Sequence, residues 1–151
     1  MRRERKEPDE ADADEMLTIS AEQVCFVIVK AREFDVKEEN SGLESGSNAS
    51  DDQLSVLEES HEDSVQLELE SFISDLTEDE QIDLVALAWL GRDDNTLDDW
   101  PSMREEAARA YKPRPGATAR YLLGMPLLSD YLEEGLSLFG KSCEQFEMGR
   151  L

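Results

Sequence analysis

Apolar side chains recur every three or four residues through much of the chain, and this spacing constrains the fold more than any other feature. Such a period places apolar residues on one face of an α-helix, whereas a half-buried strand alternates apolar and polar residues. Residues 63–76 show the pattern clearly, and strands have no comparable candidate. We therefore predict an all-α domain, a compact bundle of about five to six helices. The apolar positions of the 63–76 helix are Val65, Leu69, Phe72, Ile73 and Leu76.

Capping boxes mark the start of three helices, because in each a Ser or Thr is followed three residues later by a Gln, Glu or Asp. The first box precedes residues 24–29, a run that is apolar on every side and that could also form a buried strand. The cap and the continuation of one apolar stripe to Phe34 favour a helix. The boxes are Ser20 with Gln23 and Thr77 with Glu80, and Thr96 with Asp99 resembles a third.

Glycine and proline indicate where the later helices end. The second predicted helix begins near Asp63 or Ser64, and a very short turn joins it to the third, which ends at Gly91. Three further helices are expected over residues 100–111, 118–123 and 128–139. Pro101 fits the first turn of the 100–111 helix, where a missing N–H is tolerated.

The chain divides into one helical domain and segments of low apolar content. Residues 1–15 contain no large apolar side chain after Met1, so we expect a flexible tail. Residues 16–140 form the domain. Within it, residues 39–61 are rich in Gly, Ser, Asn and Asp, and we expect a disordered acidic loop there. Residues 141–151 are expected to form a C-terminal tail.

Acidic residues are concentrated in the middle of the chain. The net charge is −22, and residues 41–100 hold 18 acidic side chains and one basic side chain, that of Arg92. Residues 101–151 hold seven of each sign. A negative field of this size repels nucleic-acid phosphates and anionic membranes, and it attracts cationic partners. No apolar run approaches the roughly 18 residues that a membrane-spanning helix needs. Direct nucleic-acid binding and membrane insertion are therefore disfavoured.

Three segments carry a resemblance to a known family. They are residues 25–34 (CFVIVKAREF), 84–92 (LVALAWLGR) and 121–136 (YLLGMPLLSDYLEEGL). With these segments the chain resembles, over roughly residues 16–147, a bacterial family of small acidic proteins classed as domain of unknown function 3775. The resemblance implies a bacterial, cytoplasmic helical domain. It implies no activity, cofactor or site residue.

No motif with a stated catalytic mechanism is present, so the sequence favours a protein without enzymatic activity and without a cofactor. The turn at Asp93 fails as a calcium loop, because its sixth and twelfth positions hold Asp98 and Arg104 instead of Gly and Glu. His61 is the single histidine, and together with Glu58 and Glu62 it is a weak candidate for a divalent metal site. A solvated charge run explains the same residues.

Cys25 and Cys143 are the two cysteines. Without an apparent secretory signal we expect a cytoplasmic protein, in which two reduced, buried thiols are the default. A bridge that ties the first helix to the C-terminal tail is the alternative.

These observations favour an interaction domain that binds a basic partner protein through its acidic 41–100 half. A small carboxylate-based hydrolase or transferase and a nucleic-acid charge mimic are the alternatives. The basic stretch around residues 104–120 could contact phosphate, or it could pair with the acidic half of the same chain or of a second copy, which would give a homodimer. We expect the aromatic residues to lie in the core, as large apolar side chains usually do. The alternative for Trp100 is that its side chain is exposed and anchors the protein in a groove of a partner. The candidate partner-binding residues are Asp93, Asp94, Asp98, Asp99, Trp100, Arg104, Arg109, Lys112 and Arg114.

Overall fold

Across the part of the chain that the structure describes, every regular element is a helix. The computed structural model describes the backbone of residues 16–44 and 52–144 and the side chains of residues 16–36 and 64–144. No strand occurs in these ranges, so the all-α prediction is confirmed. The elements are α2 (Ala21–Glu44), α3 (Asp52–Asp75), α4 (Glu78–Arg92), the 3-10 turn η2 (Leu97–Asp99), α5 (Trp100–Ala110), α6 (Ala117–Leu123) and α7 (Leu128–Leu138).

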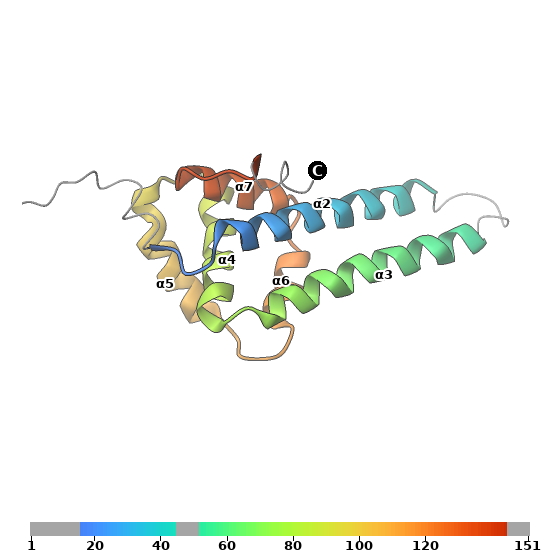
Figure 1. The fold of residues 1–151 in the computed structure, drawn as a ribbon, viewed down its shortest axis with the longest axis horizontal. Helices are drawn as coiled ribbons and strands as arrows, with labels where there is room; N and C mark the ends of the chain where they lie inside the picture. The colour runs from blue at the N-terminus through green and yellow to red at the C-terminus, as the bar shows by residue number, and fades with distance from the viewer. Residues whose placement is uncertain (1–15, 45–51, 145–151) are drawn as a thin grey trace, which may run out of the picture.

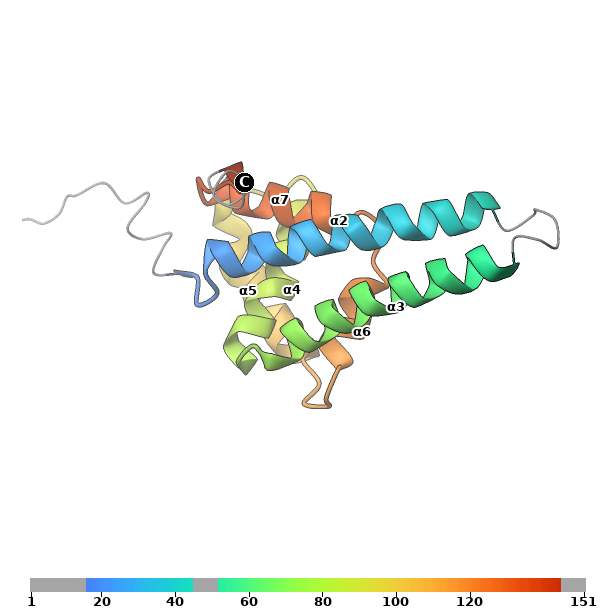
Figure 2. The same cartoon turned by 45° about the vertical axis from the view of Figure 1, so that its right-hand side comes forward.

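Helices α2 and α3 lie side by side as a long antiparallel hairpin, and their far ends extend beyond the other helices (Figures 1 and 2). Phe26 and Phe72 stack between them with ring centroids 4.3 Å apart. The prediction of a loop over residues 39–61 is wrong for most of that range, because α2 continues to Glu44 and α3 begins at Asp52. The remaining part, residues 45–51, lies outside the described residues. Glycine and serine are concentrated before residue 51, whereas residues 52–63 are mostly ordinary helix formers.

The three predicted capping boxes are all present. The Ser20 hydroxyl accepts the N–H of Gln23 at 3.0 Å, and the Gln23 side chain accepts the N–H of Ser20 at 2.9 Å. The reciprocal bonds also form at Thr77 before α4 and at Thr96 before η2. These side chains satisfy backbone donors that have no partner within the helix, so they fix where each element begins.

Helix α4 packs against α5, α6 and α7, and it makes its most extensive contacts with α7. The two helices approach closely at Gly91 and Gly135. A Cβ atom on Gly91 would lie 2.0 Å from the carbonyl oxygen of Tyr131, and one on Gly135 would lie 2.6 Å from the carbonyl oxygen of Leu87. The prediction that Gly91 ends the helix is therefore wrong. Gly91 lies within α4, which continues to Arg92, and its lack of a side chain permits the crossing.

The core is formed by the apolar faces that the helical period predicts. From α2 it includes Val24, Val27 and Ile28, and from α3 it includes Leu69 and Ile73, all fully buried. Burial of such side chains contributes about 1.5–3 kcal/mol each to folding. The other fully buried large side chains include Leu84, Leu87, Leu90, Leu122, Leu132 and Leu136.

A disulfide joins Cys25 of α2 to Cys143, whose Cα atoms are 5.6 Å apart. The expectation of two reduced thiols is therefore wrong in this structure, and the alternative of a bridge to the C-terminal segment is correct. Both cysteines are buried, so the described part of the predicted tail, residues 141–144, is fastened to the core. Residues 145–151 and the predicted tail at 1–15 lie outside the described residues.

No helix in residues 16–44 and 52–144 combines the length and the apolar character needed to cross a bilayer.

Candidate functional site

The most buried charged group in the described structure is the carboxylate of Asp83, in the middle of α4. One of its oxygens accepts the backbone N–H groups of Thr18 and Ile19, at 2.5 and 3.1 Å. Its other oxygen accepts the Nε–H of Arg104 from α5 at 2.6 Å. The carboxylate thus joins the segment before α2, α4 and α5, and three donors compensate its burial.

Arg104 also reaches Asp79, one helical turn before Asp83, with its Nη2 atom 3.2 Å from Oδ1. Partial burial alone would lower the pKa of Arg104, but the hydrogen bonds and charges of Asp83 and Asp79 outweigh it and raise the pKa above its ordinary value. Arg104 therefore pairs with the acidic half of its own chain. For Arg104, the alternative that the basic stretch pairs with the acidic half of the same chain is therefore correct.

The acidic side chains predicted to bind a partner lie at the turn between α4 and α5. Asp93, Asp94 and Asp98 are exposed, and Asp93 lies 3.9 Å from the Arg92 guanidinium. Asp99 accepts the N–H of Thr96 in the capping box. The structure therefore places these four carboxylates at one end of α4. Of the four, Asp99 caps the start of η2 with its side chain.

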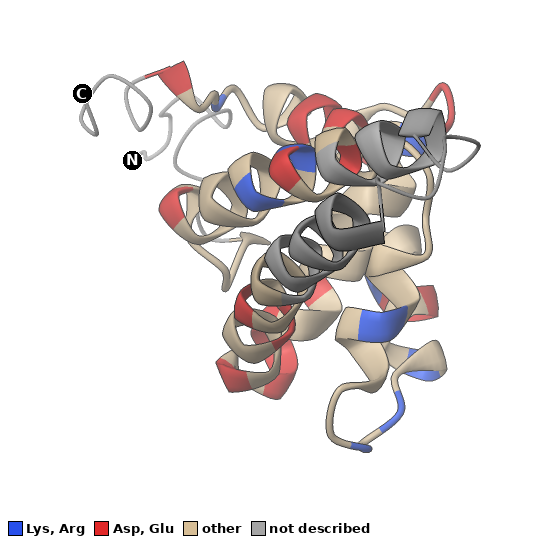
Figure 3. Ribbon diagram, turned by 90° about the vertical axis from the view of Figure 1, so that its right-hand side faces the viewer, with Lys and Arg blue, Asp and Glu red and all other residues tan. Residues whose placement is uncertain are grey.

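A second acidic corner lies at the other end of α4, where α3 ends. Asp75 and Glu78 flank the turn and are exposed. Neither forms an ion pair or a side-chain hydrogen bond with any described residue. Most of the described acidic residues of the 41–100 half thus lie at the two ends of α4, while Glu68 and Glu70 belong to α3 and Asp83 is buried in the middle of α4. Figure 3 shows red segments on several helices and turns.

Trp100 does not lie at the surface. Its side chain is 3% exposed and packs edge-on against Phe139 at 5.1 Å between ring centroids. The Trp100 side chain fills the core beside α7. It therefore has no exposed surface with which it could anchor a partner in this structure.

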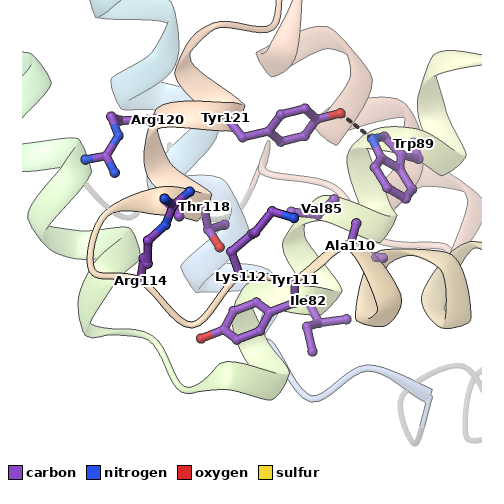
Figure 4. A pocket seen from close by; sticks show the side chains of 12 residues that line it. Ile82, Val85, Trp89, Ala110, Tyr111, Lys112, Arg114, Thr118, Arg120 and Tyr121 are labelled. Atoms are coloured by element: carbon purple, nitrogen blue, oxygen red, sulfur yellow. Dashed lines mark hydrogen bonds between the residues drawn. The ribbon is translucent and has the colours of Figure 1, made fainter.

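A pocket of about 270 Å³ opens between α4, α5 and α6 (Figure 4). Its volume is just below the roughly 300–1,000 Å³ that is typical of small-molecule sites. Apolar and aromatic side chains form most of its lining, and the indole N–H of Trp89 donates to the hydroxyl of Tyr121 at 2.8 Å across one wall. The two rings meet edge-on, with centroids 6.4 Å apart. The lining residues are Ile82, Val85, Trp89, Ala107, Ala110, Tyr111, Lys112, Arg114, Ala117, Thr118, Arg120 and Tyr121.

Three cations border this pocket, and none of the lining residues is acidic. Lys112, Arg114 and Arg120 are exposed and form no ion pair with any described residue, in contrast to Arg104 and to Arg109, which pairs with Glu105 at 3.2 Å. The loop before α6 and α6 itself carry blue segments without red ones in Figure 3.

Lys112 and Arg114 were predicted from the sequence as partner-binding residues, whereas the pocket beside them was not predicted. A signal was present, since residues 107–129 contain four basic residues and no acidic one in a chain of net charge −22. The apolar lining could not be predicted in the same way, because it combines faces of three helices whose packing the sequence pattern does not specify.

The structure does not describe the side chains of the three residues that were weak candidates for a metal site. The side chains of Glu58, His61 and Glu62 lie outside the described residues, although the backbone there belongs to α3. Among the side chains that are described, no three of His, Cys, Asp or Glu converge as metal ligands would.

Comparison with known proteins places the chain in a family. No curated protein and no solved structure matches it significantly. The model of one family matches residues 66–141, from the second half of α3 to just past α7, and its description is protein of unknown function (DUF3775). The match is narrower than the resemblance over 16–147, since it leaves α2 and the first part of α3 outside. It includes the pocket, both glycines of the α4–α7 crossing and the Asp83–Arg104 pair. The chain belongs to the DUF3775 family.

Proposed function

We propose that the protein is a non-enzymatic interaction domain that binds a basic partner protein through carboxylates of its acidic 41–100 half. The observation that carries the proposal is the excess of carboxylates without a cation. Asp75 and Glu78 at one end of α4, and Asp94 and Asp98 at the other, have no ion pair and no side-chain hydrogen bond among the described residues. A cationic surface would relieve their mutual repulsion, so the two ends of α4 are the candidate contact surfaces.

Affinity capture from a native lysate, followed by mass spectrometry, identifies the partner, and its dissociation constant is then measured at two salt concentrations. Binding through exposed charges should weaken about tenfold or more between about 50 and about 500 mM salt, because ions screen such contacts. A dissociation constant that does not change with salt contradicts the proposal.

Paired variants locate the contact without disturbing the caps. D75N/E78Q removes two charges at the α3–α4 turn, and D94N/D98N removes two at the α4–α5 turn. E106Q/E134Q is the matched control, since it removes two exposed charges outside the acidic half. One of the first two variants should weaken binding about tenfold, which corresponds to about 1.4 kcal/mol. Equal effects of all three variants would show a general field instead of a contact surface.

The pocket between α4, α5 and α6 does not support the carboxylate-based hydrolase or transferase, because none of its lining residues carries a carboxylate. A nucleic-acid charge mimic needs carboxylates at phosphate-like spacing along one ordered face. The described acids of the 41–100 half are instead spread over α3, the two ends of α4 and its buried middle.

A bacterial cytoplasmic location remains part of the proposal, and the Cys25–Cys143 bridge provides a test of it. Reducing systems keep cytosolic thiols reduced, whereas disulfides persist in oxidising compartments. Both thiols are buried, so an alkylating agent is added as the cells are denatured; it should label both cysteines if the protein resides in the cytoplasm, whereas an intact bridge contradicts that location.

A further inference from the structure

The pocket between α4, α5 and α6 has a composition that the interaction proposal does not use. Apolar and aromatic side chains form most of its lining, three cations border it, and none of its lining residues is acidic, in a protein of strongly negative charge. A cationic rim without carboxylates is unexpected in so acidic a chain. Ion pairs with some of its many carboxylates would stabilise Lys112, Arg114 and Arg120, yet none of the pocket residues is acidic.

One buried polar group in the pocket lacks a hydrogen-bond partner among the described residues. Thr118, at the start of α6, is 8% exposed and lines the cavity, yet its hydroxyl forms no hydrogen bond with any described residue. Buried hydroxyl groups are normally hydrogen-bonded, because an unmade bond costs about 1–3 kcal/mol. Figure 4 shows this hydroxyl among the lining side chains, between Arg114 and Lys112. An acceptor atom that enters the cavity would complete it.

We propose that this pocket binds a small organic anion that has an aromatic body and a terminal carboxylate or phosphate group. The aromatic body lies against Val85, Trp89 and Tyr121, where an edge-on contact with the Trp89–Tyr121 pair is available. The anionic oxygens accept hydrogen bonds from Thr118 and contact Lys112 and Arg114 at the rim. The cavity volume of about 270 Å³ accommodates a single ring with a short side chain.

The pocket contains its own reporter. The indole N–H of Trp89 is hydrogen-bonded at the cavity wall, whereas the second tryptophan, Trp100, is buried outside the lining. In a proton–nitrogen correlation spectrum of the full chain, the two indole resonances report on the pocket and on the core separately. The W89F variant assigns them.

The probes are phenylacetate and phenyl phosphate, compared with neutral phenylacetamide and with inorganic phosphate, each titrated to about 10 mM. At least one aromatic anion should shift the Trp89 indole resonance with a saturable, millimolar or tighter dissociation constant and leave Trp100 in place. The relative affinities of phenylacetate and phenyl phosphate then show which anionic group the site prefers. Phenylacetamide and inorganic phosphate should each bind at least tenfold more weakly, since each lacks one half of the recognised chemistry.

Surface variants test the residues assigned to the ligand. R114Q and K112Q should each raise the dissociation constant of the better probe about fivefold to tenfold, and T118V, which keeps the shape of the side chain, should raise it by a similar factor. R109Q is the matched control, because Arg109 is exposed on α5, pairs with Glu105 and does not line the pocket. It should leave the affinity within about twofold.

Several outcomes would overturn the proposal. No saturable shift with either aromatic anion would show that the pocket does not take this class of ligand. Equal binding of phenylacetamide would show an apolar cavity without anion recognition, and equal binding of inorganic phosphate would show cation-driven binding alone. A Trp89 shift that depends on protein concentration without any probe would mean that a second copy covers the pocket. None of these results bears on the acidic corners, so the two proposals fail independently.

Discussion

Gly91 of α4 and Gly135 of α7 meet backbone to backbone, so that a Cβ atom on Gly91 would lie 2.8 Å from the amide nitrogen of Gly135. The atoms that such a Cβ would strike belong to the main chain of the other helix and cannot move aside as a side-chain end could. The separation of α4 and α7 is thus determined by the absence of two side chains, and every residue buried between these helices depends on it.

Replacing either glycine by alanine should therefore destabilise the fold. G91A and G135A are each expected to lower the free energy of unfolding by about 1–3 kcal/mol, because overpacking forces backbone shifts. G124A is the control, since its Cβ would meet only ordinary contacts at 3.5 and 3.7 Å. Urea denaturation monitored by circular dichroism measures all three, and equal stability of G91A and the unchanged protein would contradict the crossing.

The two carboxylates that share Arg104 should differ strongly in their contribution to stability. D83A removes the carboxylate that accepts hydrogen bonds from two backbone N–H groups and from Arg104. The three donors lose this acceptor, so the free energy of unfolding should fall by about 3–5 kcal/mol. D79N removes an exposed partner of the same guanidinium, at a cost of at most about 1 kcal/mol. Thermal or urea unfolding distinguishes them, and a similar loss in both variants would show that Asp83 is not the structural acceptor described above.

The contribution of Arg104 to stability should not depend on pH in the neutral range. Its pKa is raised in the folded state, so the stabilisation is fully present below the pKa of the unfolded chain and is lost only as the pH rises through the folded value. Both values lie far above neutrality. The difference in unfolding free energy between the unchanged protein and R104M, measured from pH 6 to pH 9, should therefore stay constant apart from changes at other groups.

Reduction of the disulfide should lower stability markedly. The bridge between Cys25 and Cys143 spans 118 positions of the sequence, and in the chain-entropy view a loop of about 100 residues corresponds to about 4.7 kcal/mol. A reducing agent should shift the urea midpoint of the unchanged protein downward. The double variant C25A/C143A should unfold at a low midpoint whether or not the reductant is present.

A strained backbone position should respond favourably to glycine. Leu127, directly before α7, has a φ of 64°, and its side chain is largely exposed. Non-glycine residues lose about 1–2 kcal/mol in this left-handed region, and the greater flexibility of glycine in the unfolded chain offsets part of that. L127G should thus be about 0.5–1 kcal/mol more stable than L127A, which keeps the strain and loses the same side chain. A lower urea midpoint for L127G would show that no strain is relieved there.

Local sequence signals predicted most of the fold because they act within one or two helical turns. The side chains of Ser20, Thr77 and Thr96 each accept from a backbone N–H two or three residues further on, and the structure contains all three caps. The error at residues 39–61 arose from averaging one composition over two different parts. The segment that begins at Asp52 is acidic, but an acidic residue in the first turn suits a helix N-terminus.

Features that depend on contacts far apart in sequence could not be predicted in the same way. Gly91 matched a helix-ending signal, and only the approach of α7 reveals its different role. Asp83 resembled any other acid of the middle region, although it is buried against a segment 65 residues earlier in the chain. For the pocket, the sequence revealed the cations on one loop, while the apolar lining required the packing of α4, α5 and α6.

The Cys25–Cys143 bridge makes the backbone between these residues a covalent circle that contains α3 to α7. A protease that cuts this segment once therefore produces no separate fragment, and the nicked molecule keeps its mass apart from one added water until a reductant opens it. Two fragments that appear only on a reducing gel would reveal the circle directly. A nicked protein of this kind could keep its pocket and its acidic corners while its chain is no longer continuous.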